Sequence, residues 1–279
     1  MVQGNALVLG GGGVTGVAWE TGILAGLSEA GLDVSGADLL VGTSAGAAVA
    51  AQLGSGTPLS DLLEAQRAGA AREIAATIGP AVLARFVWTM LTTRDPGAYG
   101  RAMGRLALGA RTVSEADRRS VIASRLPSHD WPERSVKITS VNARTGEFRV
   151  FARDDGVALV DAVAASCAVP GVWPPVSIDG EQWIDGGMRS AVNANLATGC
   201  ARVVILAPIT SGFGAVQSVG RQAAALRTAG SEVVVVSPSR EAKARMGRNS
   251  LDPSQRAAAA EAGHRQAPQE LDRIAAVWR

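Results

Sequence analysis

The sequence has few aromatic residues, few cysteines and no apolar run long enough to cross a membrane. Phe, Trp and Tyr make up 4% of the 279 residues although 47% are hydrophobic, so Ala, Val and Leu must fill the interior. The two cysteines, Cys167 and Cys200, lie in apolar stretches, which is typical of buried, reduced thiols. No stretch reaches the roughly 18 uninterrupted apolar residues of a transmembrane helix.

Strong charge of either sign is lacking too. The formal net charge is +2, and only Lys137 and Lys243 among the 27 basic residues are lysine. This balance gives no reason to expect nucleic acid as a partner. No group of His, Cys and Asp has metal-ligand spacing, so neither a metal nor a cofactor is expected. The N-terminus lacks the basic and apolar regions of a signal peptide, which predicts a cytoplasmic location.

A serine lies between an apolar run and an Ala-rich helical pattern. Leu39–Val41 reads as a buried strand, and Gly42 and Gly46 flank Ser44 in the Gly-x-Ser-x-Gly spacing of a nucleophile elbow. On such a sharp turn the serine backbone is strained, and side chains two residues to either side would collide. The helix that follows favours negative charge beside the serine. Ser44 is therefore predicted to be a nucleophile at the end of the second strand.

Four consecutive glycines, Gly10–Gly13, follow the strand expected at Ala6–Leu9. Together with Gly16 they match the Gly-x-Gly-x-x-Gly pattern of dinucleotide-binding folds. That fold needs an acidic residue at the end of the second strand, where this chain has Gly42–Ser44. A P-loop is excluded because no Gly-Lys-Ser/Thr follows the glycines. A catalytically silent nucleotide-binding module stays open as an alternative function.

The same glycines fit an oxyanion hole better. The amides of Gly11, Gly12 and Gly13 would converge, free of side chains, at the N-terminus of a helix. Neighbouring parallel strands end in one crevice, so the glycine loop and the Ser44 turn are expected to face each other.

A serine nucleophile needs a base, and Asp185 is the best candidate. It ends a predicted strand pair and is followed by Gly186 and Gly187, a turn that would give a substrate close access. Partial burial would raise the pKa of this carboxyl toward neutrality. The competing base is His264, which would complete the Ser, Asp, His order of α/β-hydrolases in a non-lipid carboxylesterase. His264 lies in a polar helical segment, where a solvated position is expected.

The order of strands and helices predicts an α/β fold. We expect a three-layer sandwich with a mostly parallel central sheet, formed by one domain over residues 1–279. Residues 58–127 are expected to form a helical, cap-like region, and residues 240–279 a C-terminal helical segment. Glu20, Asp154 and Asp155 are expected to be surface charges.

The segment Gly79–Thr92 is the most apolar helical stretch of the chain, and it has two interpretations. It is either a helix packed on the sheet or a cap that lines an acyl-chain groove or transiently touches a lipid surface. Arg72, Arg85 and Arg94 lie nearby in the sequence.

The glycine loop Gly11–Gly16, the serine turn Gly42–Gly46 and the turn Asp185–Gly187 occur in this order. Together they resemble the motifs of the patatin-like phospholipase family, over about residues 6–207. The segment Ala165–Pro170 is similar to the one that precedes the family's aspartate. The resemblance implies a Ser44–Asp185 dyad that hydrolyses acyl esters of phospholipids or related lipids without a histidine or metal, with the glycine loop as oxyanion hole. The chain departs from the family at Thr15, where members often carry a basic residue.

Overall fold

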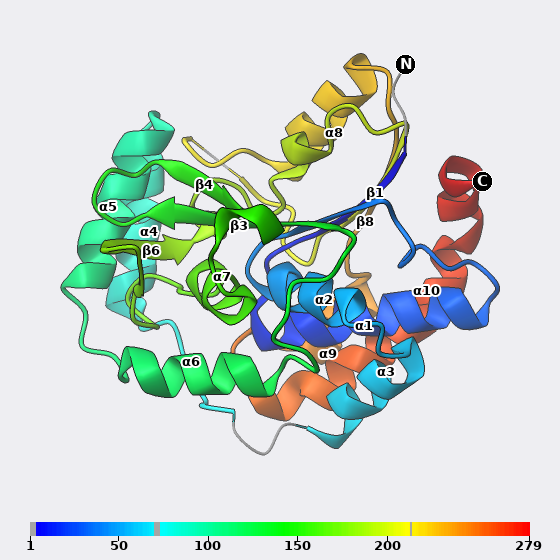
Figure 1. Cartoon of the computed structure of the whole chain (residues 1–279), viewed down its shortest axis with the longest axis horizontal. Coiled ribbons are helices and arrows are strands. Elements are labelled where there is room, and N and C mark those ends of the chain that lie inside the picture. Colours follow the sequence, from blue (N-terminus) through cyan, green and yellow to red (C-terminus); the bar gives the residue numbers. More distant parts are fainter. Residues whose placement is uncertain (1–3, 70–72, 213) are drawn as a thin grey trace.

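The computed structural model describes residues 4–69, 73–212 and 214–279, and these residues form helices around one eight-stranded sheet (Figure 1). The strand order is β5-β6-β3-β2-β1-β7-β8, with β4 paired to β3 outside this path. The strands are β1 (Asn5–Leu9), β2 (Leu39–Gly42), β3 (Ser135–Asn142), β4 (Phe148–Phe151), β5 (Val176–Ile178), β6 (Glu181–Asp185), β7 (Arg202–Leu206) and β8 (Glu232–Val236).

Most of the sheet is parallel. The strands β3, β2, β1, β7 and β8 run in one direction, whereas β4, β5 and β6 are antiparallel to their neighbours. The central strand β1 pairs with β2 from Ala6 opposite Leu39 to Leu9 opposite Gly42. The predicted α/β class, with its mostly parallel sheet and its turn after the second strand, is confirmed.

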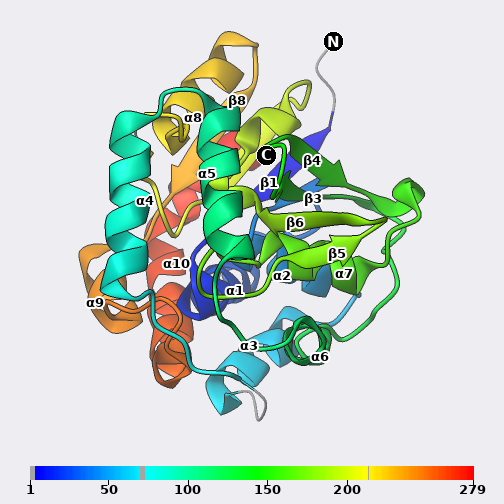
Figure 2. The ribbon, with the colours of Figure 1, turned by 90° about the vertical axis from the view of Figure 1, so that its left-hand side faces the viewer.

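Helices cover both faces of the sheet because side chains alternate along the buried strands. Leu7 and Leu9 of β1 pack into a core with the helices on one face, and Ala6 and Val8 pack on the other. The first face carries α1 (Gly13–Glu29), α2 (Ala45–Gly54), α3 (Leu59–Ala68), α7 (Leu159–Ser166), α9 (Arg240–Met246) and α10 (Arg256–Trp278), with α6 (Glu115–Ser124) packed on α7. The opposite face carries α8 (Val219–Thr228) and α5 (Pro96–Leu108), and α4 (Pro80–Thr92) lies beside α5 (Figure 2).

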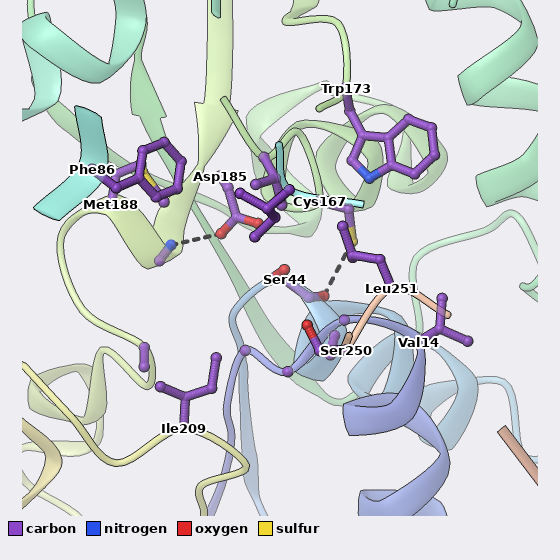
Figure 3. A pocket seen from close by; sticks show the side chains of 18 of the residues that line it. Val14, Ser44, Phe86, Cys167, Trp173, Asp185, Met188, Ile209, Ser250 and Leu251 are labelled. Atoms are coloured by element: carbon purple, nitrogen blue, oxygen red, sulfur yellow. Dashed lines mark hydrogen bonds between the residues drawn. The ribbon is translucent and has the colours of Figure 1, made fainter. Parts of the chain in front are cut away.

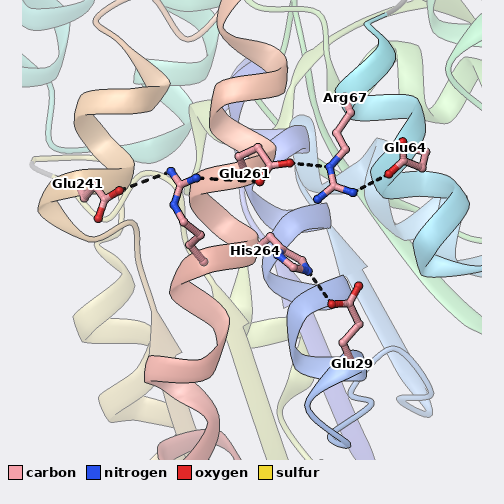
Figure 4. A network of polar contacts seen from close by, with 7 residues as sticks. Glu29, Glu64, Arg67, Glu241, Glu261 and His264 are labelled. Carbon is pink, nitrogen blue, oxygen red and sulfur yellow. Dashed lines mark hydrogen bonds and ion pairs between the residues drawn. The ribbon is translucent and has the colours of Figure 1, made fainter.

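The C-terminal helix α10 is part of the core although its sequence is polar and Ala-rich. Glycines bring α10 and α1 into close contact, because a Cβ at Gly22 would overlap the Ala260 carbonyl and one at Gly263 would overlap that of Trp19. The outer side of the pair carries polar contacts, among them the hydrogen bond between His264 Nε2 and Glu29 Oε2 at 2.8 Å (Figure 4). The His264 backbone packs beside Gly22 and Gly26, so it lies along the second half of α1, roughly 14–20 Å along the helix from the glycine loop at its start.

The helix α4 does not have the burial of an ordinary core helix. Leu83, Val87, Trp88 and Leu91 are exposed, with Trp88 at 69% of its full accessibility, whereas the other side of α4 packs against α5. The interpretation of this segment as plain core is therefore wrong for its outward face. Of the nearby arginines, Arg72 lies outside the described residues, and Arg85 and Arg94 are exposed. Among the described residues, no helix combines the length and apolar character that crossing a membrane requires.

Candidate active site

Ser44 sits on a strained turn between β2 and α2. Its backbone has φ 53° and ψ −114°, a region that side-chain-bearing residues rarely adopt. The two flanking glycines are needed for steric reasons. A Cβ at Gly42 would lie 2.6 Å from Ala47 Cα, and one at Gly46 would overlap the Leu9 carbonyl oxygen. The local geometry is that of a nucleophile elbow.

The end of α7 holds this turn in place. The Ser44 amide donates to Ser166 Oγ at 2.9 Å, and the Cys167 thiol donates to the Ser44 carbonyl at 3.2 Å (Figure 3). Cys167 is buried as expected, and burial raises the pKa of its thiol to about 11. Sequence reasoning gave Ser166 no role, because a serine inside an Ala-rich helix carries no local signal for a contact with a distant turn.

Asp185 ends β6 and faces the same space as Ser44 (Figure 3). Its Oδ1 accepts a hydrogen bond from the Gly187 amide at 2.7 Å. Burial raises the pKa of this carboxyl to about 7, while the Ser44 hydroxyl and the Gly187 amide favour its ionised form and partly offset that effect.

The glycine loop meets the Ser44 turn directly. The Gly46 amide donates to the Gly10 carbonyl at 2.9 Å, because β1 and β2 are neighbours that end at the same edge of the sheet. The Gly11 amide donates to the Ala191 carbonyl at 2.7 Å, so it is not free to bind an oxyanion as the sequence predicted. Gly12 and Gly13 line the cavity together with Ser44, and among the described residues neither of their amides has a hydrogen-bond partner.

Glu20 is fully buried in α1, so its prediction as a surface charge is wrong. Its Oε1 accepts a hydrogen bond from the Gly10 amide at 2.8 Å, and burial raises the pKa of the carboxyl well above its usual range. The periodicity of α1 did not show this burial, because α1 is covered by α2 and α3 as well as by α10. Glu20 thus anchors the start of the glycine loop.

Asn193 connects the segments that carry the candidate residues, and sequence reasoning missed it. Its backbone is left-handed (φ 48°), and its buried Nδ2 donates to Thr43 Oγ1 at 3.1 Å and to the Gly186 carbonyl at 3.2 Å. These bonds join the residue before Ser44 to the residue after Asp185. The Asn193 amide makes these bonds because the fold places it between two loops that are distant in the sequence. No spacing pattern in the sequence predicts such a position.

Ser44 and Asp185 line one cavity of about 390 Å³. Its walls are mostly apolar side chains from α1, α4 and the loops after β7 and α9, including Val14, Leu83, Phe86, Met90, Ile209 and Leu251. Among the described residues that line it there is no histidine: His264 pairs with Glu29, and His129 contacts the Ala123 carbonyl at 3.0 Å. Among the same residues, no cluster of His, Cys, Asp and Glu could hold a metal ion. Such a cavity has the size and lining of a site for an apolar acyl chain.

The fold is mixed α/β, with a mostly parallel central sheet between layers of helices. The model of the family Patatin-like phospholipase matches residues 7–198, and the chain belongs to this family of lipid acyl hydrolases.

Two solved structures are similar to this chain at low sequence identity. VipD from Legionella pneumophila is 14% identical with a TM-score of 0.48, and the match covers 98% of this chain and 67% of that one. The type III effector protein ExoU is 16% identical with a TM-score of 0.44, and the match covers 98% of this chain and 53% of that one. This chain thus spans about two thirds and about half of their lengths. A comparison with curated proteins gave no match.

Proposed function

We propose that this protein is a serine acyl hydrolase that cleaves fatty-acyl esters of phospholipids or related lipids with Ser44 as nucleophile and Asp185 as base. One observation carries the proposal: a serine on a strained elbow and a buried carboxyl line the same apolar cavity. A pKa of about 7 suits a general base near neutral pH, because about half of such groups are ionised and the carboxylate is still basic enough to take a proton.

In the proposed reaction, the Asp185 carboxylate takes the Ser44 hydroxyl proton as Oγ forms a bond to the ester carbonyl carbon. The carbonyl electron pair moves to oxygen, and the Gly12 and Gly13 amides at the start of α1 stabilise that oxyanion. When the tetrahedral intermediate collapses, the ester C–O bond breaks and Asp185 gives its proton to the leaving alcohol. Water then attacks the acyl-enzyme with Asp185 again as base, which releases the fatty acid and restores Ser44.

Two alternatives receive less support from the described residues. A Ser-His-Asp triad would need a histidine at the site, and the His264 side chain is held by Glu29, the last residue of α1. A nucleotide would place polar groups against a wall that is mostly apolar.

A fluorophosphonate probe tests the proposal. We expect the probe to modify the wild-type protein at Ser44, as located by peptide mass spectrometry, and a phospholipid panel to release fatty acid. The Ser44→Ala variant should neither label nor hydrolyse. Absence of labelling in a correctly folded wild-type protein would exclude a serine hydrolase and leave the glycine loop as a binding feature.

We further propose that the outward face of α4 contacts the lipid surface from which the substrate is taken. Leu83 and Val87 are exposed and also line the cavity, so the apolar surface is continuous with the site. Trp88 and Leu91 extend it outward, and the exposed Arg85 lies on the same helix. An apolar helix face flanked by arginine is typical of interfacial binding.

The double substitution of Trp88 and Leu91 by Ala is expected to lower hydrolysis of anionic phospholipid vesicles about tenfold, because each side chain contributes a part of the roughly 1.5–3 kcal/mol of full burial. Hydrolysis of p-nitrophenyl butyrate and the melting temperature should stay unchanged, since both side chains are exposed. Leu108→Ala, which removes an exposed leucine of α5, is the matched control. Equal losses on vesicles and on the soluble ester would contradict the proposal.

A further inference from the structure

A buried arginine lines the cavity that contains Ser44 and Asp185, and it takes no part in the reaction proposed above. Arg118 lies on α6, only 4% of its surface is exposed, and it lines the cavity that contains Ser44. Its Nε and Nη1 are buried and have no hydrogen-bond partner among the described residues. Its guanidinium carbon lies 3.8 Å from the centroid of the Trp173 ring, a stack that orients the group and leaves these donors unsatisfied.

Nearby acids do not neutralise Arg118. Glu73 is the carboxylate of this cluster, and its two oxygens bind Arg125 Nη2 at 2.6 Å and Arg256 Nη1 at 3.1 Å. The described part of the cluster therefore holds three guanidinium groups and one carboxylate. Burial lowers the pKa of Arg118 to about 10, with a smaller contribution from Arg125, so Arg118 is still charged at neutral pH.

Arg118 is on the Cys167 side of the nucleophile. The Cys167 thiol donates to the Ser44 carbonyl, and the charge of Arg118 favours the ionised form of that thiol. Figure 3 shows Trp173, whose ring Arg118 stacks on, and Cys167 on one wall of the cavity beside Ser44.

We propose that Arg118 binds the phosphate of the substrate, which makes the preferred substrate a phospholipid and not a neutral glyceride. The inference rests on the proposed acyl hydrolase function. Leaving a buried charged donor unsatisfied is costly, and a phosphate oxygen would supply the missing partner through charge-assisted hydrogen bonds. A guanidinium presents several N–H donors and a fixed positive charge to such an oxyanion. Because Arg118 and Ser44 line one cavity, the phosphate and the scissile ester would be bound together.

A pair of soluble substrates that differ only in the phosphate tests this assignment. We would measure kcat and KM for 1-octanoylglycerol 3-phosphate and 1-octanoylglycerol, which carry the same acyl ester. Arg118→Met is expected to lower the ratio of the two kcat/KM values by about 10- to 100-fold, the range of a charged hydrogen bond. The change should be mainly in KM for the phosphorylated substrate, and Arg118→Lys should restore part of it.

The matched control is Arg119→Gln on the same helix. Arg119 is exposed and pairs with Asp161, so its loss should leave the substrate ratio unchanged. Equal losses on both substrates together with a lower melting temperature would show that Arg118 only supports the fold through Trp173, and an unchanged ratio would also overturn the inference. If octanoate inhibition weakens in Arg118→Met while the KM of the phosphorylated substrate stays constant, the anion is the product carboxylate and the inference is wrong. A wild-type protein that cleaves neither ester would instead contradict the proposed acyl hydrolase.

Discussion

Replacing Ser44 by Ala or Asp185 by Asn is expected to lower kcat by about 10⁴-fold or more, because each change removes a group without which the other cannot act. Ser44 Oγ is a weak nucleophile until its proton is taken, and Asp185 is the carboxylate that shares its cavity. The Ser44→Ala, Asp185→Asn double variant should be hardly slower than either single variant. Steady-state hydrolysis of a p-nitrophenyl ester measures all three.

His264→Ala is the control for this experiment. It removes the hydrogen bond with Glu29 on the outer side of α1 and α10, away from the cavity, so we expect nearly wild-type kcat. If His264→Ala is inactive while Asp185→Asn keeps its activity, the assignment of the base is wrong.

The pH dependence follows from the same carboxyl. The base must be ionised and its pKa is about 7, so kcat/KM should fall about tenfold per unit as the pH decreases below 6 and level off above 8. The folded-state pKa lies above the unfolded value of 3.8, so the folded state binds more protons between about pH 4 and 7. Stability from this group is therefore greatest below pH 4 and is lost as the pH rises through 7, by up to about 4 kcal/mol.

The Asp185→Asn variant tests whether burial of the ionised Asp185 carboxyl lowers the stability of the fold, independently of its role in catalysis. Its melting temperature should exceed that of the wild type at pH 8 by more than at pH 5, because Asn carries no charge to desolvate. A difference that is the same at both pH values would show that Asp185 does not titrate in this range.

Replacing Gly13 by Ala is expected to lower kcat by about 10²–10³-fold, which is the usual cost of losing one oxyanion donor. Gly13 has φ +61°, and an added Cβ would lie 2.5 Å from the Ser250 carbonyl oxygen. Because this contact is to a backbone atom, the loop must move, and the Gly12 and Gly13 amides would move with it. Labelling by a fluorophosphonate, whose oxygen occupies the same hole, should slow in parallel.

Gly31→Ala controls for the backbone penalty alone. Gly31 also has a positive φ of 83°, but an added Cβ would meet nothing within 4 Å, and it lies just beyond the other end of α1. We expect both variants to lose some stability and only Gly13→Ala to lose most of its activity. Full activity of a folded Gly13→Ala protein would show that the glycine loop is only a turn and does not stabilise an oxyanion.

The sequence alone was sufficient for the features that depend on short-range sterics. A side chain at Gly42 would overlap Ala47 of the same turn, so the turn at Ser44 leaves a local sign in the glycines around one serine. Strands such as Leu39–Gly42 are likewise visible, because a fully buried parallel strand must be apolar on both faces. The α/β class and the order of motifs along it follow from such local patterns.

The tertiary structure alone decided which groups are buried and which have partners. From the sequence, Gly11, Gly12 and Gly13 were equal candidates for oxyanion donors, but in the structure the Gly11 amide donates to the Ala191 carbonyl. The burial that raises the pKa of Asp185 depends on helices and loops that are distant in the chain, and so does the lack of a partner for Arg118 among the described residues. Desolvation and hydrogen bonding are properties of everything that surrounds a group, and a sequence records only the neighbours along the chain.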